Sequence, residues 1–258
     1  MTGLILHHEH SGPAGEPDLL FVGSLGTTLE MWEQQVAALA DRRSLVCVDV
    51  RGHGRSPAPG GAYSIAELAT DVVATLDALR IRRISVCGLS IGGMIGMWLA
   101  AHVPERVERL VLICTSAHMP AASDAYRDRA RTVRSHGSPE PVADGVLERW
   151  FTPAWAEAHE ETVASYRRML CATPADGYAG CCEAIAALDL RSELPQIAAP
   201  TLVIAGAADR ATPPEHAEAI TAAIPTARLE VLGEAAHLAS VQRPDEVTQL
   251  VDEHLTDR

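Results

Sequence analysis

Apolar residues recur along the chain in two alternating patterns. Short, nearly continuous apolar runs predict buried β-strands, and the stretches between them have the three- and four-residue spacing of helices. Runs that are apolar at every position need cover on both faces, so we expect a parallel sheet between helical layers, an α/β fold. The expected strands are 19–22, 44–50, 83–87, 109–114, 201–205 and 227–232, and the expected helices are 32–40, 65–79, 92–102, 214–223 and 244–255.

The alternation stops in the segment 118–194. This segment is helical in pattern, contains no convincing strand, and is rich in Arg, Ala and Glu. We interpret it as a helical lid inserted after the strand 109–114. The chain of 258 residues is long enough for one core domain, formed by residues 1–117 and 195–258, with the lid 118–194 inserted in it.

Composition narrows the classes of partner. The formal net charge of −13 disfavours nucleic acid and anionic membranes. All 21 basic residues are Arg, which excludes chemistry that needs a catalytic Lys. We expect no signal peptide and no membrane span, and the six cysteines form no Cys-x-x-Cys pair, so a cytoplasmic location fits best. His7, His8 and His10 have no clear partner set elsewhere, so we expect no metal site.

The strongest chemical signal is the sequence Gly-Leu-Ser-Ile-Gly at positions 88–92. It follows the strand 83–87 directly and leads into the apolar helix 92–102, which is the context that a Gly-x-Ser-x-Gly turn requires. A tight, strained turn there projects the serine hydroxyl above the sheet, and only glycine leaves room around it. We therefore predict that Ser90 is the nucleophile of an acyl-transfer enzyme, in an arrangement that resembles the α/β-hydrolase fold.

An acid and a histidine must follow such a nucleophile in that order. Asp209 follows the strand 201–205, and His237 follows the strand 227–232. Loops at the carboxyl ends of parallel strands meet at one edge of the sheet, so we expect both side chains near Ser90. His237 would take the Ser90 proton, since histidine titrates near neutrality, and Asp209 would fix the tautomer of His237.

The oxyanion of such a reaction needs preorganised N–H donors. One should be the backbone of Ile91, directly after the nucleophile. The other should come from the loop that follows the strand 19–22, where we favour the backbone of Leu25.

Four segments carry a more particular pattern. They are Ser-Leu-Gly-Thr-Thr-Leu-Glu-Met-Trp at 24–32, Asp-Val-Arg-Gly-His-Gly-Arg-Ser at 49–56, the stretch 88–100, and a lid pattern with Arg-Trp-Phe-Thr-Pro at 149–153, Ala-Thr-Pro at 172–174 and Gly-Tyr-Ala-Gly-Cys-Cys at 177–182. Over nearly its whole length the chain resembles the 3-oxoadipate enol-lactonases, α/β-hydrolases of bacterial protocatechuate and catechol degradation. Gly23 stands where the family pattern has Asn, and Tyr126 where it has Trp.

This resemblance implies a substrate and a binding requirement. The substrate would be a small anionic lactone, a five-membered enol lactone with an acetate side chain, opened to 3-oxoadipate without a cofactor. Its carboxylate needs a cation once water is excluded, and Arg is the natural partner. On the expected helix 123–135, Arg129 belongs to the inward stripe of Tyr126, Ala130 and Val133. We hypothesise Arg129 as the carboxylate clamp, with Arg134, near the border of that stripe, second.

Alternatives stay open for these lid residues. Arg129 could instead pair with a lid carboxylate such as Asp128 or Glu148. Trp150 and Tyr178 are further expected substrate contacts from the lid pattern, and the alternative for the segment around Tyr178 is helix packing without ligand contact.

Two other functions compete with the lactonase. A carboxylesterase or perhydrolase-like enzyme would use the same fold and the same triad, since a fold does not determine a substrate. A non-enzymatic binding protein of this fold predicts a broken triad, whereas Ser90, Asp209 and His237 are all present. The sequence does not determine the oligomeric state.

Overall fold

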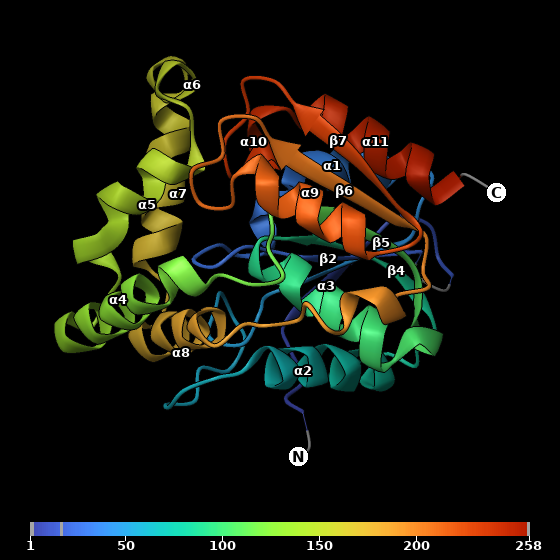
Figure 1. The fold of residues 1–258 in the computed structure, drawn as a ribbon, viewed down its shortest axis with the longest axis horizontal. Helices are drawn as coiled ribbons and strands as arrows, with labels where there is room; N and C mark the ends of the chain where they lie inside the picture. Colours follow the sequence, from blue (N-terminus) through green and yellow to red (C-terminus); the bar gives the residue numbers. More distant parts are fainter. Residues whose placement is uncertain (1–2, 16–17, 257–258) are drawn as a thin grey trace.

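The computed structural model describes residues 3–15 and 18–256, so the ends of the predicted core ranges, 1–2 and 257–258, lie outside the described residues. A seven-stranded sheet has the order β1-β3-β2-β4-β5-β6-β7 (Figure 1). β1 is antiparallel to β3, and every other neighbouring pair is parallel. The strands are β1 (His8–Ser11), β2 (Leu19–Val22), β3 (Leu45–Val48), β4 (Ile84–Leu89), β5 (Val107–Ile113), β6 (Thr201–Gly206) and β7 (Ala227–Leu232).

Helices follow most strands, and together with the parallel sheet they confirm the predicted α/β class. The helices of the core are α1 (Glu33–Leu39), α2 (Ile65–Ala78), α3 (Ile91–His102), α9 (Pro214–Ala223), α10 (Ala239–Gln242) and α11 (Pro244–Thr256). α2 packs against α3, and α1 packs against α11. Every residue of β2, β3, β4 and β6 is buried. Because successive side chains of a strand point to opposite faces, these strands must be covered on both sides.

Local sequence explains where the elements begin and end. α2 begins after Ser64, which forms a capping box with Glu67, so the predicted helix 65–79 is nearly the observed one. The predicted strand 44–50 is shorter in the structure and ends at Val48. The carboxylate of Asp49 instead accepts hydrogen bonds from the N–H groups of Leu29, at 2.7 Å, and Arg55, at 2.9 Å, so the chain there already belongs to a loop.

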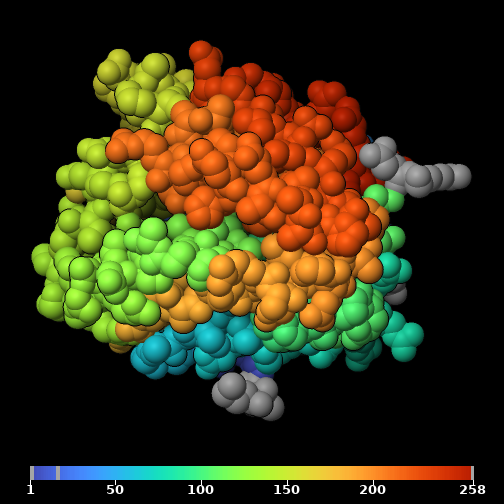
Figure 2. Space-filling view, viewed as in Figure 1, coloured from blue at the N-terminus to red at the C-terminus, as the bar shows by residue number. Residues whose placement is uncertain are grey.

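The segment between β5 and β6 is helical, and it lies to one side of the sheet (Figure 1, yellow-green). Its helices are α4 (Ser123–His136), α5 (Ala143–Trp150), α6 (Pro153–Ala158), α7 (Glu160–Cys171) and α8 (Ala175–Ala186). α4 packs closely along α8. Figure 2 shows this helical group packed against the C-terminal part of the chain, in orange. Among the described residues, no helix is both long and apolar enough to cross a membrane.

Candidate active site

The turn between β4 and α3 presents Ser90. Its backbone has φ 56° and ψ −115°, a conformation that L-residues rarely adopt. Two close approaches explain the flanking glycines. A Cβ on Gly88 would lie 2.2 Å from the carbonyl oxygen of Gly92, and a Cβ on Gly92 would lie 2.1 Å from that of Val22. The backbone N–H of Ser90 donates to the carbonyl of Ile113 on β5 at 2.9 Å, which holds the strained turn on the sheet.

Asp209 and His237 lie on the loops after β6 and β7. His237 Nδ1 lies 2.8 Å from Asp209 Oδ2, and both side chains are buried. A carboxylate only accepts hydrogen bonds, so Nδ1 carries the proton and Nε2 is left free to act as a base. Thr212 donates to Asp209 from both its N–H, at 3.0 Å, and its hydroxyl, at 2.8 Å. Burial raises the pKa of Asp209, but the charge and hydrogen bond of His237 and the Thr212 hydrogen bonds outweigh it and hold this pKa below its ordinary value.

The two predicted oxyanion donors come from neighbouring loops. Leu25 lies between β2 and the 3₁₀ turn at Leu29–Trp32, and Ile91 is the first residue of α3. Both residues are buried, and among the described residues neither backbone N–H donates a hydrogen bond. Buried N–H groups are rarely left without a partner, so two such groups close to a nucleophile are a fitting receptor for a negative oxygen.

Gly23, which stands where the family pattern has Asn, also has a structural reason. A Cβ at this position would lie 2.9 Å from both Met31 Sδ and Thr27 Oγ1. Those two atoms accept the hydrogen bond of the Ser24 N–H, at 3.3 and 3.0 Å respectively. The side chains of Thr27 and Met31 therefore support the loop from the position that a side chain at Gly23 would occupy.

A small cavity joins these groups to the helical segment. It has a volume of about 20 Å³, little more than the roughly 10–15 Å³ that one water molecule needs. The residues that line it come from the core loops and from α4, α5 and α8: Ser24, Leu25, Ser90, Tyr126, Arg129, Val146, Arg149, Trp150, Tyr178, Ala211 and His237. Ser90, His237 and Leu25 thus meet at one place, together with Arg129, Trp150 and Tyr178.

Two arginines face this cavity. Arg129 on α4 lies over the ring of Tyr126, with 4.9 Å between its Cζ and the ring centroid. Arg149 comes from the last turn of α5. Among the described residues, neither guanidinium lies within 4.0 Å of a carboxylate. Burial lowers the pKa of Arg149, and the positive charge of the nearby Arg129 lowers it further because like charges repel.

These contacts decide between the alternatives for the two predicted clamp residues, Arg129 and Arg134. Asp128 pairs with Arg131, and Arg129 has no carboxylate partner in the described chain, so the structure does not contain the alternative pairing of Arg129 with Asp128 or Glu148.

Arg134 does not line the cavity. Its guanidinium forms ion pairs with Glu183 on α8 and with Asp176, and it also donates to the carbonyl of Gly61 at 2.8 Å. Its charge therefore stabilises the contact between α4 and α8, so the prediction of Arg134 as a second clamp is wrong, and the second arginine at the cavity is Arg149. The sequence did contain a signal for Arg149, which directly precedes Trp150 in the Arg-Trp-Phe-Thr-Pro pattern.

Tyr178 and Trp150 form apolar walls of the cavity, and both are buried. Burial raises the pKa of Tyr178 above its ordinary range, and the nearby charge of Arg129 offsets part of this effect. Tyr126, which stands where the family pattern has Trp, lines the same cavity beneath Arg129. The ring of Tyr126 thus forms a cation–π contact with Arg129 in addition to lining the cavity.

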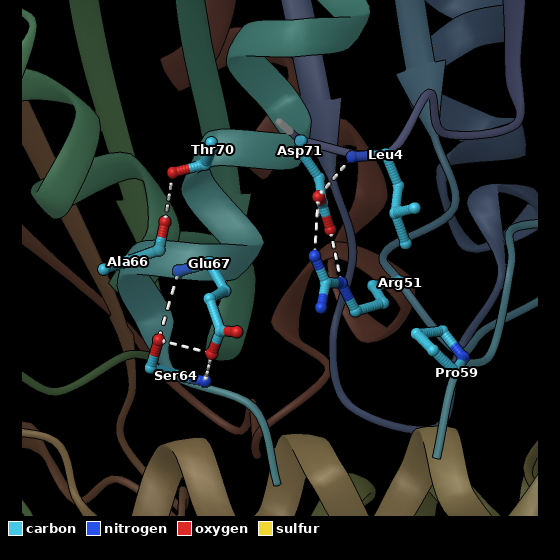
Figure 3. A pocket seen from close by; sticks show the side chains of 9 residues that line it. Leu4, Arg51, Pro59, Ser64, Ala66, Glu67, Thr70 and Asp71 are labelled. Atoms are coloured by element: carbon cyan, nitrogen blue, oxygen red, sulfur yellow. Dashed lines mark hydrogen bonds and ion pairs between the residues drawn. The ribbon is translucent and has the colours of Figure 1, made fainter. Parts of the chain in front are cut away.

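A larger cavity of about 430 Å³ lies elsewhere, at the N-terminal end of α2 (Figure 3). Its one arginine, Arg51, is already neutralised by Asp71, through two hydrogen bonds of 2.6 and 2.8 Å. The Asp71 carboxylate also accepts from the N–H of Leu4 at 2.7 Å. These polar groups satisfy one another, and the pocket contains none of the groups around Ser90, so we interpret it as a structural feature.

The histidines near the start of the chain also have local partners. His7 Nδ1 lies 2.8 Å from Asp49 Oδ2, and His8 Nδ1 lies 2.9 Å from the Leu6 carbonyl. Within residues 3–15 and 18–256, no three His, Cys, Asp or Glu side chains are grouped closely enough to hold a metal ion.

Comparisons with known proteins agree with this geometry. The family model of the alpha/beta hydrolase fold matches residues 17–244. The chain is 42% identical to 3-oxoadipate enol-lactonase 2 of Acinetobacter baylyi, over 96% of this chain and 91% of the relative. It is 34% identical to 3-oxoadipate enol-lactonase 1 of the same organism, over 96% and 92%.

A solved structure gives the same result. The crystal structure of the enol-lactonase from Burkholderia xenovorans matches with a TM-score of 0.91 and 40% identity, covering 98% of this chain and 96% of that one. The chain therefore belongs to the α/β-hydrolase fold family and, within it, to the 3-oxoadipate enol-lactonases.

Proposed function

We propose that this protein is a serine hydrolase that opens the enol lactone of 3-oxoadipate to 3-oxoadipate. The observation that best supports an anionic substrate concerns Arg129 and Arg149. These two cations face the same cavity as Ser90, and neither has a carboxylate partner in the described chain. A substrate that brings its own carboxylate would pair with both guanidinium groups and offset one of their two positive charges. Like charges that lie close together repel each other, so two half-buried cations that face one cavity without a carboxylate partner indicate an anion site.

The reaction follows from the positions of the polar groups. Ser90 Oγ attacks the lactone carbonyl while His237 Nε2 takes its proton, and the N–H groups of Leu25 and Ile91 stabilise the oxyanion. The ring C–O bond then breaks. The enol oxygen leaves with the bonding electron pair and takes the proton from His237. The enol formed in this way tautomerises to the ketone. Water, deprotonated by His237, cleaves the acyl-enzyme and restores Ser90, so that lactone and water yield 3-oxoadipate.

We also propose that the segment 118–194 acts as a lid. A five-membered lactone with an acetate arm is several times larger than the cavity of about 20 Å³. Arg129 belongs to α4 and Arg149 belongs to α5. If these two helices separate to admit the substrate, the two guanidinium groups separate with them. The carboxylate of the bound substrate would then draw the two arginines together again and close the lid. For the location of the enzyme we propose the cytoplasm, because all six cysteines are free thiols.

Kinetics on a charged and a neutral substrate test the carboxylate site. We expect Arg129→Ala and Arg149→Ala each to lower kcat/KM for the enol lactone by about 10- to 100-fold, the loss of a charge-assisted hydrogen bond. Hydrolysis of p-nitrophenyl acetate, which carries no carboxylate, should change by less than about threefold.

Arg131→Ala is the matched control, because Arg131 lies on α4 but pairs with Asp128 at the surface. Equal losses on both substrates in the Arg129 and Arg149 variants would contradict the carboxylate site. Rapid turnover of neutral esters with no turnover of the enol lactone would instead support the rival carboxylesterase.

A further inference from the structure

The loop 23–28 between β2 and the 3₁₀ turn at Leu29–Trp32 carries the candidate oxyanion donor Leu25; we call it the oxyanion loop. Its neighbouring N–H groups are tied inside the protein. The N–H of Ser24 donates to Thr27 Oγ1 at 3.0 Å, and the N–H of Gly26 donates to His53 Nε2 at 2.8 Å. The direction of the Leu25 N–H therefore depends on how the peptides on either side of it are held.

The tautomer of His53 follows from its two partners. The backbone N–H of Gly26 can only donate, so His53 Nε2 must accept with a free lone pair. The carbonyl of Arg51, 3.1 Å from His53 Nδ1, can only accept, so Nδ1 must carry the proton. A neutral imidazole with its proton on Nδ1 satisfies both partners at once, whereas an imidazolium or the other tautomer would lose the bond to Gly26.

The imidazole is itself held rigidly. His53 is fully buried, and burial lowers its pKa, which favours the neutral ring. Its flanking residues Gly52 and Gly54 have φ of +77° and +51°, which lets the chain turn sharply on both sides of the ring. The side chain of Arg51 is bonded to Asp71 (Figure 3), so the carbonyl that accepts from His53 belongs to an anchored residue.

The same stretch of chain supports the far end of the oxyanion loop. Asp49 Oδ1 accepts from the N–H of Leu29 at 2.7 Å. Gly26 itself has φ +83°, and a Cβ there would lie 2.5 Å from the Leu170 side chain of α7, so the loop packs closely against this helix. Asp49 thus holds the chain just after the loop and His53 holds its middle, and neither residue lines the cavity.

From this arrangement we infer that His53 is a positioning residue for catalysis: it holds the Gly26 peptide so that the N–H of the preceding Leu25 stays directed at the oxyanion. This inference rests on the proposed acyl-transfer function, but not on the identity of the lactone. The oxyanion forms during hydrolysis of any ester, so the effect of His53 must appear on neutral esters as well as on the enol lactone.

A pair of amide variants separates the two hydrogen bonds of His53. Gln at this position can place its carbonyl oxygen near the position of Nε2 and still accept from Gly26. Asn is shorter and can donate to the Arg51 carbonyl but does not reach Gly26. We expect His53→Asn to lower kcat by about 10- to 100-fold with KM unchanged, on both the enol lactone and p-nitrophenyl acetate, because an oxyanion contact acts only in the transition state. His53→Gln should recover most of this loss.

The affinities of two ligands provide a second test of the role of His53. Phenylboronic acid adds to the serine as a tetrahedral anion, so its affinity should fall in parallel with kcat in His53→Asn, while the affinity for adipate, a ground-state ligand, stays constant. His254→Asn is the control for a structural role, since His254 is buried and bonded to the Pro200 carbonyl far from the site. That variant should lose thermal stability and keep kcat.

Several outcomes would overturn the inference. Equal loss of kcat in the Gln and Asn variants, a rise in KM with kcat unchanged, or a lower melting temperature with full activity would each reduce His53 to a structural residue. Nitrogen NMR of the wild-type protein tests the same point without a variant. At pH 7 it should show His53 neutral and protonated on Nδ1, and a proton on Nε2 would contradict the bond to Gly26. If the wild-type protein turns over only the neutral ester, and His53→Asn lowers kcat for that ester, the role of His53 stands and only the lactonase is refuted.

Discussion

The backbone N–H of His237 donates a hydrogen bond to the carbonyl of Arg149, at 3.3 Å. The next residue, Leu238, bonds in the same way to the carbonyl of Trp150, at 3.0 Å. The last carbonyls of a helix have no partner inside it, and here the loop of the catalytic base satisfies two of them. The end of α5 and the loop of the base are therefore one structural unit, which places the backbone of Arg149 beside the catalytic His237.

Gln242 strengthens that unit, and its loss should be visible. Its Oε1 accepts from the N–H of Ala236 at 2.8 Å, and its Nε2 donates to Thr152 Oγ1 at 3.0 Å. We expect Gln242→Leu to lower the free energy of unfolding in urea by about 1–3 kcal/mol, since a buried N–H loses its partner, and to lower kcat. The matched control is Gln249→Leu on the exposed side of α11, which should change neither quantity measurably.

Ser90 should combine an essential side chain with a strained backbone. Ser90→Ala and Ser90→Gly are both expected to lower kcat by about 10⁴-fold or more. Because glycine adopts φ 56° readily, the Gly variant should be more stable than the Ala variant by about 1 kcal/mol in urea unfolding. An Ala variant as stable as the Gly variant would show that the turn is not strained.

Asp209 should make stability depend on acid pH. Its pKa is depressed in the folded protein, so the stabilisation is present above the ordinary carboxyl value and is lost as the pH falls through the folded pKa. Asn does not titrate, so the difference in unfolding free energy between wild type and Asp209→Asn should be largest at pH 7 and shrink toward pH 3. At pH 7 the variant should also lose about 10⁴-fold in kcat, because Asn stabilises the wrong tautomer of His237. Asp124→Asn, at an exposed position, is the control.

The close approach of Gly177 to Gly52 should determine how closely α8 packs against the core. A Cβ on Gly177 would lie 2.2 Å from the carbonyl oxygen of Gly52. We expect Gly177→Ala to destabilise the protein by about 1–3 kcal/mol and to raise KM for the enol lactone, because the adjacent Tyr178 lines the cavity. Gly233→Ala serves as the comparison, since its Cβ would meet no atom within 4 Å. If both variants behave alike, the effect comes from the helix or loop and not from the contact.

Much of the fold and the chemistry could be predicted from local features. The apolar periodicity of residues 65–79 predicted α2 to within a residue of its observed end, because helix formation depends on neighbours three and four positions apart. The spacing of Ala130 and Val133 likewise placed Arg129 on the face of α4 that meets the cavity. Strand ends were less predictable: β3 ends at Val48 because Asp49 bonds to residues from other loops.

By itself, the sequence determined the α/β order of elements, the glycine-flanked turn of Ser90, and the chain order of Asp209 and His237. Each of these depends on residues a few positions apart or on the order of the strands. Only the tertiary structure decided that Arg149 joins Arg129 at the cavity, that Arg134 pairs with Glu183, and that His53 supports Gly26. These pairs join separate elements. Their distances depend on how α4, α5, α8 and the loops pack together, and no local periodicity contains that information.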